Sequence, residues 1–157
     1  MKVISTDKAP AAIGPYSQGF IHNGIAYFSG AIPVNPATGE VPEGIDAQTR
    51  QACENCGALL EAAGLNFSNV IKTTCFLADI ADFTVFNDIY AEYFVSKPAR
   101  SCVAVKDIPK GVLCEIEIMA VTGTGTEEVG DKVKEVAGDV ADSVKDFAHD
   151  IKEKFTK

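Results

Sequence analysis

Tryptophan is absent from the 157-residue sequence, histidine occurs twice, and no run of apolar residues approaches the ~18 that a membrane-spanning helix needs. The first residues, MKVISTDKAPAAIG, contain neither the apolar core of a signal peptide nor the arginine-rich pattern of a transit peptide, so we expect a cytoplasmic protein. Positive charge is also scarce: the sequence has 14 lysines and arginines but 22 acidic residues, which gives a net charge of -8. Nucleic-acid affinity depends largely on basic side chains that neutralise phosphates, so this balance argues against a nucleic-acid-binding protein.

The two histidines, His22 and His149, exclude several kinds of catalytic site. One lies beside an expected hairpin turn and the other in a charged C-terminal segment, so they form no convincing Ser-His or Cys-His arrangement. The five cysteines are an odd number, and we expect reduced thiols. Cys53 and Cys56 have the C-x-x-C spacing of a redox pair or of half a zinc site. The same spacing fits the apolar stripe of a helix, and we favour buried thiols.

A change in composition near TGTGT, residues 122–126, divides the chain. We expect one domain at residues 1–123, which alternates strand, helix and turn signals, and a charged, proline-free extension at residues 124–157. The extension repeats every 11 residues, VGDKVKEVAGD (129–139) and then VADSVKDFAHD (140–150), so its apolar residues fall along one side of a helix. An amphipathic helix is available, but its thin valine stripe contains glycines and would be marginal alone, so partial disorder is the alternative.

The domain shows strand-like and helix-like apolar periods in turn. Asn23-Gly24, between two β-type runs, predicts a hairpin, and Asp46 and Gly64 are expected to begin and end a helix. In chain order the expected elements are strands at 16–22 and 25–32, a short strand that the following loop can hold at Glu40–Val41, a helix at 46–63, a strand at 69–78, a helix at 82–94, and strands at 99–105 and 112–121. The last two are expected to pair across KDIPKG. The resulting fold is α+β, with two helices on one face of a mainly antiparallel sheet.

Arg100 stands out because a permanently charged side chain lies at the start of the otherwise apolar stretch PARSCVAV, residues 98–105. Alternation along the last strand puts two carboxylates, Glu115 and Glu117, on the face opposite its isoleucines. The strand register decides whether Arg100 lies on the glutamate face or on the isoleucine face, and the sequence leaves both open. The pattern fits an arginine that holds an anionic substrate near a proton-transfer group, or a purely structural Arg–Glu pair.

These residues also carry a resemblance to a known family. In chain order, five segments resemble motifs of the reactive intermediate deaminase family (RidA/YjgF, also called the endoribonuclease L-PSP or liver perchloric-acid-soluble protein family): APAAIGPYSQG, FSGAIPVNPATGEVP, LEAAGL, VIKTTCFLADIADFTVFNDIYAEYF and PARSCVAVKDIPKGVLCEIEIMAV. The resemblance covers residues 5–122. It implies a chorismate-mutase-like (YjgF-like) subunit that assembles as a homotrimer, with clefts between neighbouring subunits. It also implies hydrolysis of 2-imino acids, such as 2-iminopropanoate and 2-iminobutanoate, to 2-oxo acids and ammonia, without metal or cofactor.

Matched position by position, the family's catalytic residues fall on Arg100 and Glu115. The resemblance implies that Arg100 clamps the substrate carboxylate, that the backbone of Cys102 hydrogen-bonds the substrate, and that Glu115 positions the attacking water and shuttles its proton. A protonated imine is already electrophilic, so one carboxylate and one anion clamp suffice for the chemistry. The scarcity of histidine is then no obstacle.

The resemblance places three further residues in the cleft. Tyr16 and Ser29 are expected to line it, and Gly30 to allow close approach. The sequence departs from the family in two places: the segment Phe94–Pro98 is shorter than in many relatives, and Ala31 follows FSG where many members have glutamine. Both changes bear on the rim of the cleft and on substrate preference.

Two other functions are alternatives for such a chain. One is an endoribonuclease-type inhibitor of translation, against which the acidic charge and the lack of paired histidines count. The other is a non-catalytic member that binds small ligands or acts as a holdase, with the C-terminal extension as a partner surface. Because Arg100 and Glu115 are both present, we favour catalysis.

Overall fold

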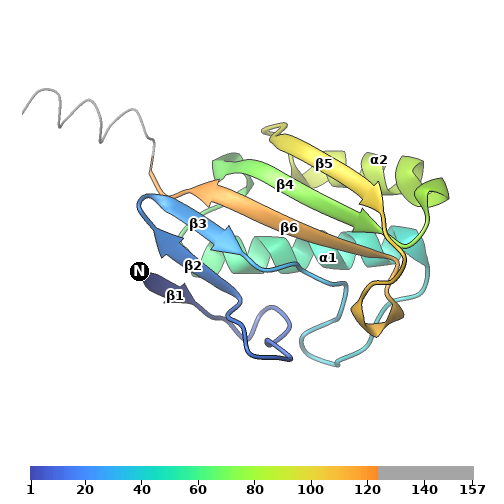
Figure 1. Ribbon diagram of the computed structural model, residues 1–157, viewed down its shortest axis with the longest axis horizontal. Helices are drawn as coiled ribbons and strands as arrows, with labels where there is room; N and C mark the ends of the chain where they lie inside the picture. The colour runs from blue at the N-terminus through green and yellow to red at the C-terminus, as the bar shows by residue number, and fades with distance from the viewer. Residues whose placement is uncertain (124–157) are drawn as a thin grey trace, which may run out of the picture. The chain divides into compact units, whose positions relative to one another are not determined.

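The computed structural model describes residues 1–123, and every structural statement below concerns these residues. The strands are β1 (Lys2–Ile4), β2 (Gly19–His22), β3 (Ile25–Phe28), β4 (Val70–Leu77), β5 (Ala99–Ala104) and β6 (Cys114–Val121), and the helices are α1 (Gly44–Ala62) and α2 (Phe83–Tyr93) (Figure 1). Short 3-10 turns occur at Phe67–Asn69, Ile80–Asp82 and Pro109–Gly111. The expected tail helix, at 124–157, lies outside the described residues. No helix within the described part is long and apolar enough to cross a membrane.

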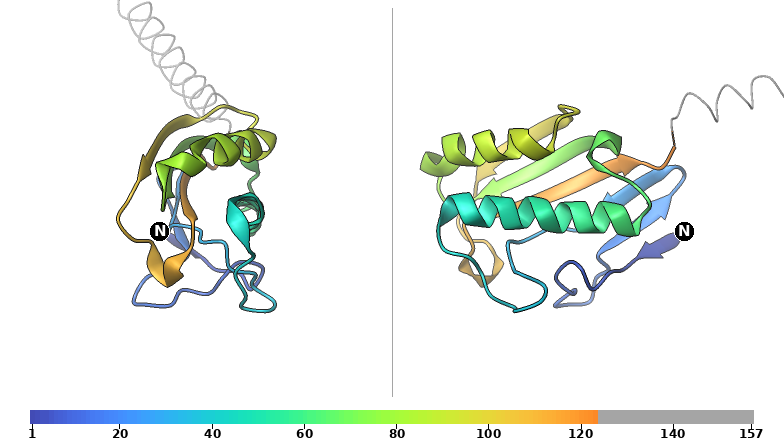
Figure 2. Two further views of the ribbon diagram at one scale, coloured as in Figure 1. Left: turned by 90° about the vertical axis from the view of Figure 1, so that its right-hand side faces the viewer. Right: turned by 180° about the vertical axis from the view of Figure 1, so that it is seen from behind.

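One mixed sheet forms the body of this unit. Its strand order is β1-β2-β3-β6-β4-β5, and all neighbours are antiparallel except β4 and β5, which are parallel. Both helices lie on the same face of the sheet, as the edge-on view shows (Figure 2). The expected α+β architecture, a mainly antiparallel sheet with two helices on one face, is therefore confirmed.

The β2–β3 hairpin forms where the Asn-Gly pair predicted it. Asn23 and Gly24 both have positive φ, 50° and 77°, which a two-residue turn between twisted antiparallel strands requires. Gly19 then pairs with Phe28, and His22 with Ile25. This local prediction succeeded because the turn residues themselves determine the geometry.

The expected hairpin of the last two strands is wrong. β6 lies between β3 and β4, whereas β5 lies at the sheet edge and pairs only with β4, in parallel. The helix α2 connects β4 to β5 as a crossover, which is the connection that parallel neighbours need. The segment 105–113 is long enough to carry the chain past β4 to the middle of the sheet. There helix α1 packs on one side of β6, and the alternate apolar side chains of this strand are buried beneath it.

A second correction concerns the third short strand. Residues Glu40–Val41 form no strand, because the loop closes on itself: the Asn35 carbonyl accepts from Gly39 N (2.8 Å) and Asn35 N donates to Glu40 O (2.8 Å). The additional strand is β1 at the N-terminus, where Val3 pairs with Phe20 of β2. Three residues are too few to show a period, which explains why the sequence pattern did not reveal it.

Helix α1 follows its expected apolar stripe. α1 begins at Gly44, with Glu43 rather than Asp46 as its N-cap residue, and Gly64 (φ 76°) terminates it as expected. α1 buries Cys53 and Cys56 completely against the sheet. All five cysteines are free, and the expected burial of the Cys53 and Cys56 thiols is observed. Burial raises the pKa of both of these thiols, because a thiolate is poorly solvated there.

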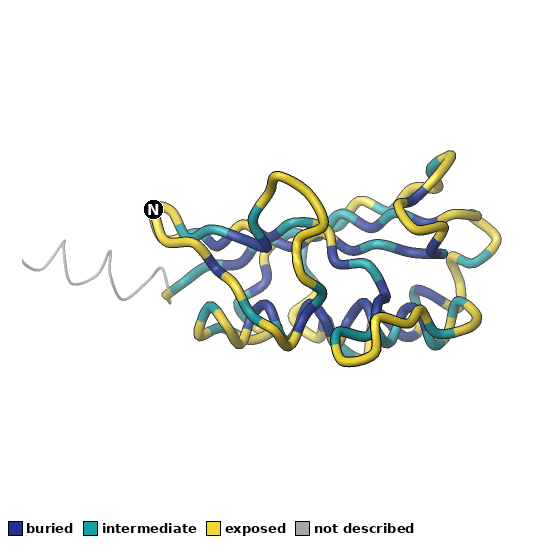
Figure 3. The backbone as a smooth tube through the Cα atoms, turned by 90° about the horizontal axis from the view of Figure 1, so that it is seen from below, coloured by how far each residue is buried: buried dark blue, intermediate teal, exposed yellow. Residues whose placement is uncertain are grey.

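The two faces of the sheet differ in cover. Along β6, Cys114, Ile116 and Ile118 are at most 1% exposed beneath the helices, whereas Glu115 and Glu117 lie on the other face, which neither α1 nor α2 covers (Figure 2). The predicted alternation is confirmed. Figure 3 shows the buried residues gathered in the strands and helices, and the loops mostly exposed. We call the uncovered side the open face and the other side the helix face.

Candidate active site

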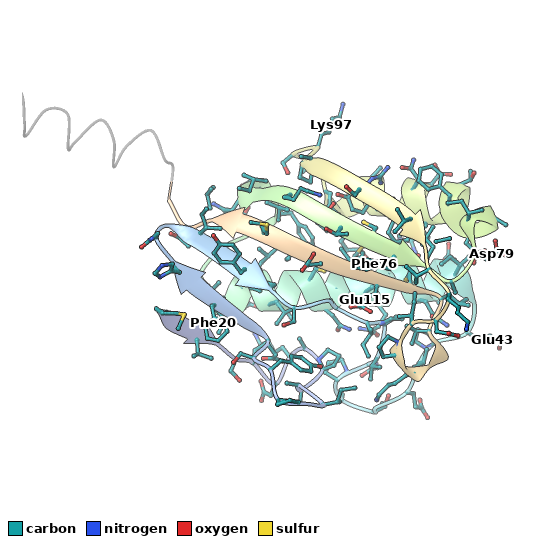
Figure 4. All side chains as sticks on the ribbon, viewed as in Figure 1. Phe20, Glu43, Phe76, Asp79, Lys97 and Glu115 are labelled. Atoms are coloured by element: carbon teal, nitrogen blue, oxygen red, sulfur yellow. The ribbon has the colours of Figure 1, made fainter. Side chains whose placement is uncertain are left out.

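Glu115 lies on the open face in the middle of the sheet, where Phe76 of β4 is its direct cross-strand neighbour (Figure 4). Beyond the end of β3, Ala31 pairs with Ile116: Ala31 N donates to Ile116 O (2.8 Å), and Ile116 N donates to Ala31 O (3.1 Å). This bridge brings Gly30 against the carboxylate. A methyl group on Gly30 would overlap Glu115 Oε1, so any side chain larger than that of glycine would displace the carboxylate. Within the described residues, the group that comes close to Gly30 is the Glu115 carboxylate, and the approach of a substrate there stays a prediction.

The environment of Glu115 disfavours its charged form. The side chain is half-buried, and this desolvation raises the pKa of its carboxyl; the negative charge of Glu117, two residues along the same face, raises it further. A carboxylate whose pKa is raised is a stronger base than a surface glutamate. The direction of this pKa shift is the one that a proton-accepting carboxylate needs.

Tyr16 and Ser29 lie beside Gly30, and the three line a small pocket of about 40 Å³. The loop that carries Tyr16 is held by Gln18, whose Nε2 donates to Pro10 O (2.8 Å) and whose Oε1 accepts from Thr6 N (2.7 Å). The Ser29 hydroxyl donates to the Ser17 carbonyl (2.7 Å) and fixes the other end of the loop. Gly30 therefore lies in the lining of the pocket that the half-exposed Tyr16 shares, and it is also the glycine that the Glu115 side chain approaches.

Arg100 lies elsewhere. It pairs with Thr73 of β4, which in turn pairs with Ile118 of β6, so its side chain is on the isoleucine side, the helix face. Cys102, two residues along β5, shares this face, since it pairs with Cys75. The register question thus resolves in favour of the isoleucine face, although β5 and β6 do not pair directly. In a single chain, Arg100 and Glu115 are on opposite faces of the sheet.

The guanidinium of Arg100 has no acidic partner among residues 1–123. Its Nη2 donates to Asn87 Oδ1 of α2 (2.9 Å), and its central carbon lies over the rings of Tyr90 (4.7 Å) and Phe83 (5.7 Å). The structural Arg–Glu pair considered from the sequence is therefore not formed among the described residues. A guanidinium whose positive charge is not neutralised is suited to bind an external anion.

A wider pocket of about 430 Å³ adjoins Arg100 between α2 and β5. Asn87, Tyr90 and Phe94 form part of its wall on the helix side, and Lys97 and Pro98 part of its wall on the strand side. The segment Phe94–Pro98, noted as short in the sequence, closes as a tight turn: Lys97 has a positive φ of 53°, and its N–H donates to Phe94 O (3.1 Å).

Sequence reasoning missed the three residues of α2 that contact Arg100. The sequence predicted a helix at 82–94 but singled out none of Phe83, Asn87 and Tyr90 as site residues. The signal was available, because a polar asparagine between two aromatic residues at helical spacing interrupts an otherwise apolar stripe. No cluster of metal-ligating side chains occurs in the described part of the chain.

Comparison with known proteins gives consistent matches over this domain. A family model described as endoribonuclease L-PSP matches residues 6–122. A Lactococcus lactis protein named as a regulator, AldR, is 54% identical over 76% of this chain and 97% of its own length. The 2-iminobutanoate/2-iminopropanoate deaminase of Bos taurus is 50% identical over 78% of this chain and 90% of its own. The crystal structure of Escherichia coli TdcF with bound serine has a TM-score of 0.75 and 44% identity, covering 77% of this chain and 98% of that one.

Proposed function

Because the chain belongs to the endoribonuclease L-PSP (RidA/YjgF) family, we propose that it is a 2-iminobutanoate/2-iminopropanoate deaminase. The substrates are small 2-imino acids, and the products are the corresponding 2-oxo acids and ammonia. The observation that carries the proposal is the pair of separate half-sites: a guanidinium with no acidic partner on the helix face, and a half-buried carboxylate against Gly30 on the open face.

The chemistry follows from these groups. Arg100 binds the substrate carboxylate, and the Cys102 backbone hydrogen-bonds the substrate beside it. Glu115 accepts a proton as a water oxygen adds to the iminium carbon, which gives a neutral carbinolamine. It then returns that proton to the nitrogen; the C–N bond breaks, and the hydroxyl proton leaves with the ammonia as ammonium. Water and the protonated imine thus become a 2-oxo acid and ammonium, with no redox step, and no cofactor is needed.

We further propose that neighbouring subunits complete the site, since the sheet separates Arg100 from Glu115 within one chain. The open face supports this. It carries an apolar surface that neither α1 nor α2 covers, formed by Val3, Phe20, Tyr27, Phe76, Val103 and Met119. Burying such a surface against like subunits is favourable. The assembly is a homotrimer, and light scattering is expected to give three times the 16.6 kDa of the chain.

The deaminase assay generates 2-iminopropanoate with an amino-acid oxidase and traps it with semicarbazide. The protein is expected to lower the trapped amount, whereas Arg100→Ala is expected to raise KM strongly and Arg100→Lys to recover little, because a single ammonium cannot hold a carboxylate bidentately. A wild-type trimer without effect on trapping would contradict the proposal. RNA cleavage is not favoured by any feature of the described site, and the cytosolic location stays a prediction.

A further inference from the structure

The guanidinium of Arg100 contacts side chains of α2 that the sequence did not predict as site residues, among them Tyr90. We infer that Tyr90 and Thr73 are positioning residues for Arg100: their mutual hydrogen bond holds the tyrosine ring beneath the guanidinium carbon and so fixes the direction in which the guanidinium meets the substrate carboxylate. This inference rests on the proposed function, because it concerns the same carboxylate clamp.

The Tyr90 ring is itself immobilised. It is 6% exposed and stacks on Phe94 of the same helix, with centroids 4.1 Å apart and planes 13° from parallel. On another side it contacts Phe86, at a centroid distance of 5.9 Å. A ring held in this way is a rigid platform, and the Arg100 carbon lies 4.7 Å from its centroid, within the range of a cation–π contact.

Thr73 completes the support from the strand side. The Tyr90 hydroxyl and Thr73 Oγ1 are 2.8 Å apart in a buried hydrogen bond, and Thr73 is fully buried. Thr73 is also the residue that pairs directly with Arg100 across β4 and β5. Thr73 therefore has two roles: its backbone lies beside that of Arg100 in the sheet, and its hydroxyl hydrogen-bonds the hydroxyl of Tyr90. A buried phenol without this partner would lose its only protein hydrogen bond among the described residues.

The hydrogen bond from Arg100 to Asn87 restricts rotation of the guanidinium within its own plane. Asn87 Oδ1 accepts one N–H of Nη2, and it is the only hydrogen bond of the guanidinium within the described chain. A guanidinium has five N–H donors, so four remain, enough for a two-point contact with a carboxylate. Burial raises the pKa of Tyr90 to about 12, although the hydrogen bond to Thr73 lowers it in part. The phenol is therefore neutral at physiological pH, and Tyr90 provides no negative charge that would compete with the substrate carboxylate for Arg100.

The test compares Tyr90→Phe, which keeps the ring and removes the hydroxyl, with Thr73→Val, which removes the partner at similar volume. Both are expected to weaken binding of the product 2-oxopropanoate by about threefold to tenfold, the usual cost of ordering one flexible side chain on binding, because Arg100 would no longer be held in place beforehand. KM for 2-iminopropanoate should rise similarly while kcat stays close to wild type. The double variant should be no weaker than the worse single variant, because both changes remove the same bond.

Two controls separate positioning from general damage. Tyr93→Phe alters another tyrosine of α2, which packs on Phe67 instead, and is expected to leave binding unchanged. Binding of 2-oxopropanamide, which lacks the carboxylate, should not respond to Tyr90→Phe. If Tyr90→Phe binds 2-oxopropanoate as wild type does, or weakens both ligands equally, the inference is wrong. A wild type that binds 2-oxopropanoate but leaves the imine intact would overturn the proposed function, and the same binding comparison would still decide the inference.

Discussion

At the residue scale, Glu115 is the group to which the mechanism assigns proton transfer. Glu115→Gln keeps the shape and most hydrogen-bonding capacity of the side chain but removes the base. We expect kcat to fall by roughly 10²- to 10⁴-fold, the usual worth of general acid–base catalysis, while 2-oxopropanoate still binds at Arg100. Steady-state kinetics and calorimetry measure the two effects. Turnover at the wild-type rate in a trimeric Glu115→Gln protein would make the carboxylate structural.

Glu117 offers a test of the electrostatics at the same scale. Half-burial and the charge of Glu117 both raise the pKa of Glu115, so Glu117→Gln removes one cause of the shift and lowers that pKa. The reaction needs ionised Glu115 to accept the water proton, so the acidic limb of the kcat/KM profile should move to lower pH. Glu40→Gln, in the exposed loop before α1, is the matched control and should leave the profile in place. An acidic limb that stays fixed in Glu117→Gln would argue against this coupling.

At the element scale, the bridge between the end of β3 and β6 is what brings Gly30 to the carboxylate. Gly30→Ala places a methyl group where Glu115 Oε1 lies, and the carboxylate has to move. We expect kcat to drop by at least tenfold with little change in 2-oxopropanoate affinity, since a small misplacement of a reacting group is costly and Arg100 is unaffected. Gly123→Ala, whose added methyl group meets no atom, serves as the control. Full activity in Gly30→Ala would show that Glu115 tolerates displacement.

The elements also show what sequence reasoning can and cannot reach. The Asn23-Gly24 hairpin, the stripe of α1 and the alternation of β6 are local periodicities, so they were predicted correctly. The place of β6 between β3 and β4 was not, because it depends on a competition among strands far apart in the chain. For the site, the resemblance supplied Arg100 and Glu115, but the face of Arg100 required the β4–β5 register. Asn87 was missed because its role appears only when α2 lies over that strand.

At the scale of the whole molecule, a site shared between subunits predicts complementation. Arg100→Ala and Glu115→Gln are each expected to be nearly inactive, yet trimers mixed from equal amounts should contain clefts with both native residues. Random assembly gives such a cleft with a chance of one half for each residue, so about a quarter of wild-type activity should return after joint refolding. Mixed trimers that remain inactive would show that both residues act within one chain.

The C-terminal extension, whose 11-residue repeat lies outside the described residues, belongs to this scale as well. Removal of residues 125–157 is expected to leave turnover and trimer formation intact, because every residue assigned to the site lies before residue 123. Kinetics and light scattering on the shortened protein measure both. A shortened protein that still forms trimers but has lost its activity would assign the extension a part in the site.

Because Arg100 and Glu115 are separated by the thickness of the sheet, a cleft shared between subunits, as proposed, would make activity sensitive to dilution. An isolated chain would then carry both residues but no complete cleft, so activity would report assembly as well as folding. Specific activity should remain constant at high protein concentration and fall once the trimer dissociates. A cell that makes too little of the protein would thus lose more protection against reactive imines than the number of missing chains suggests.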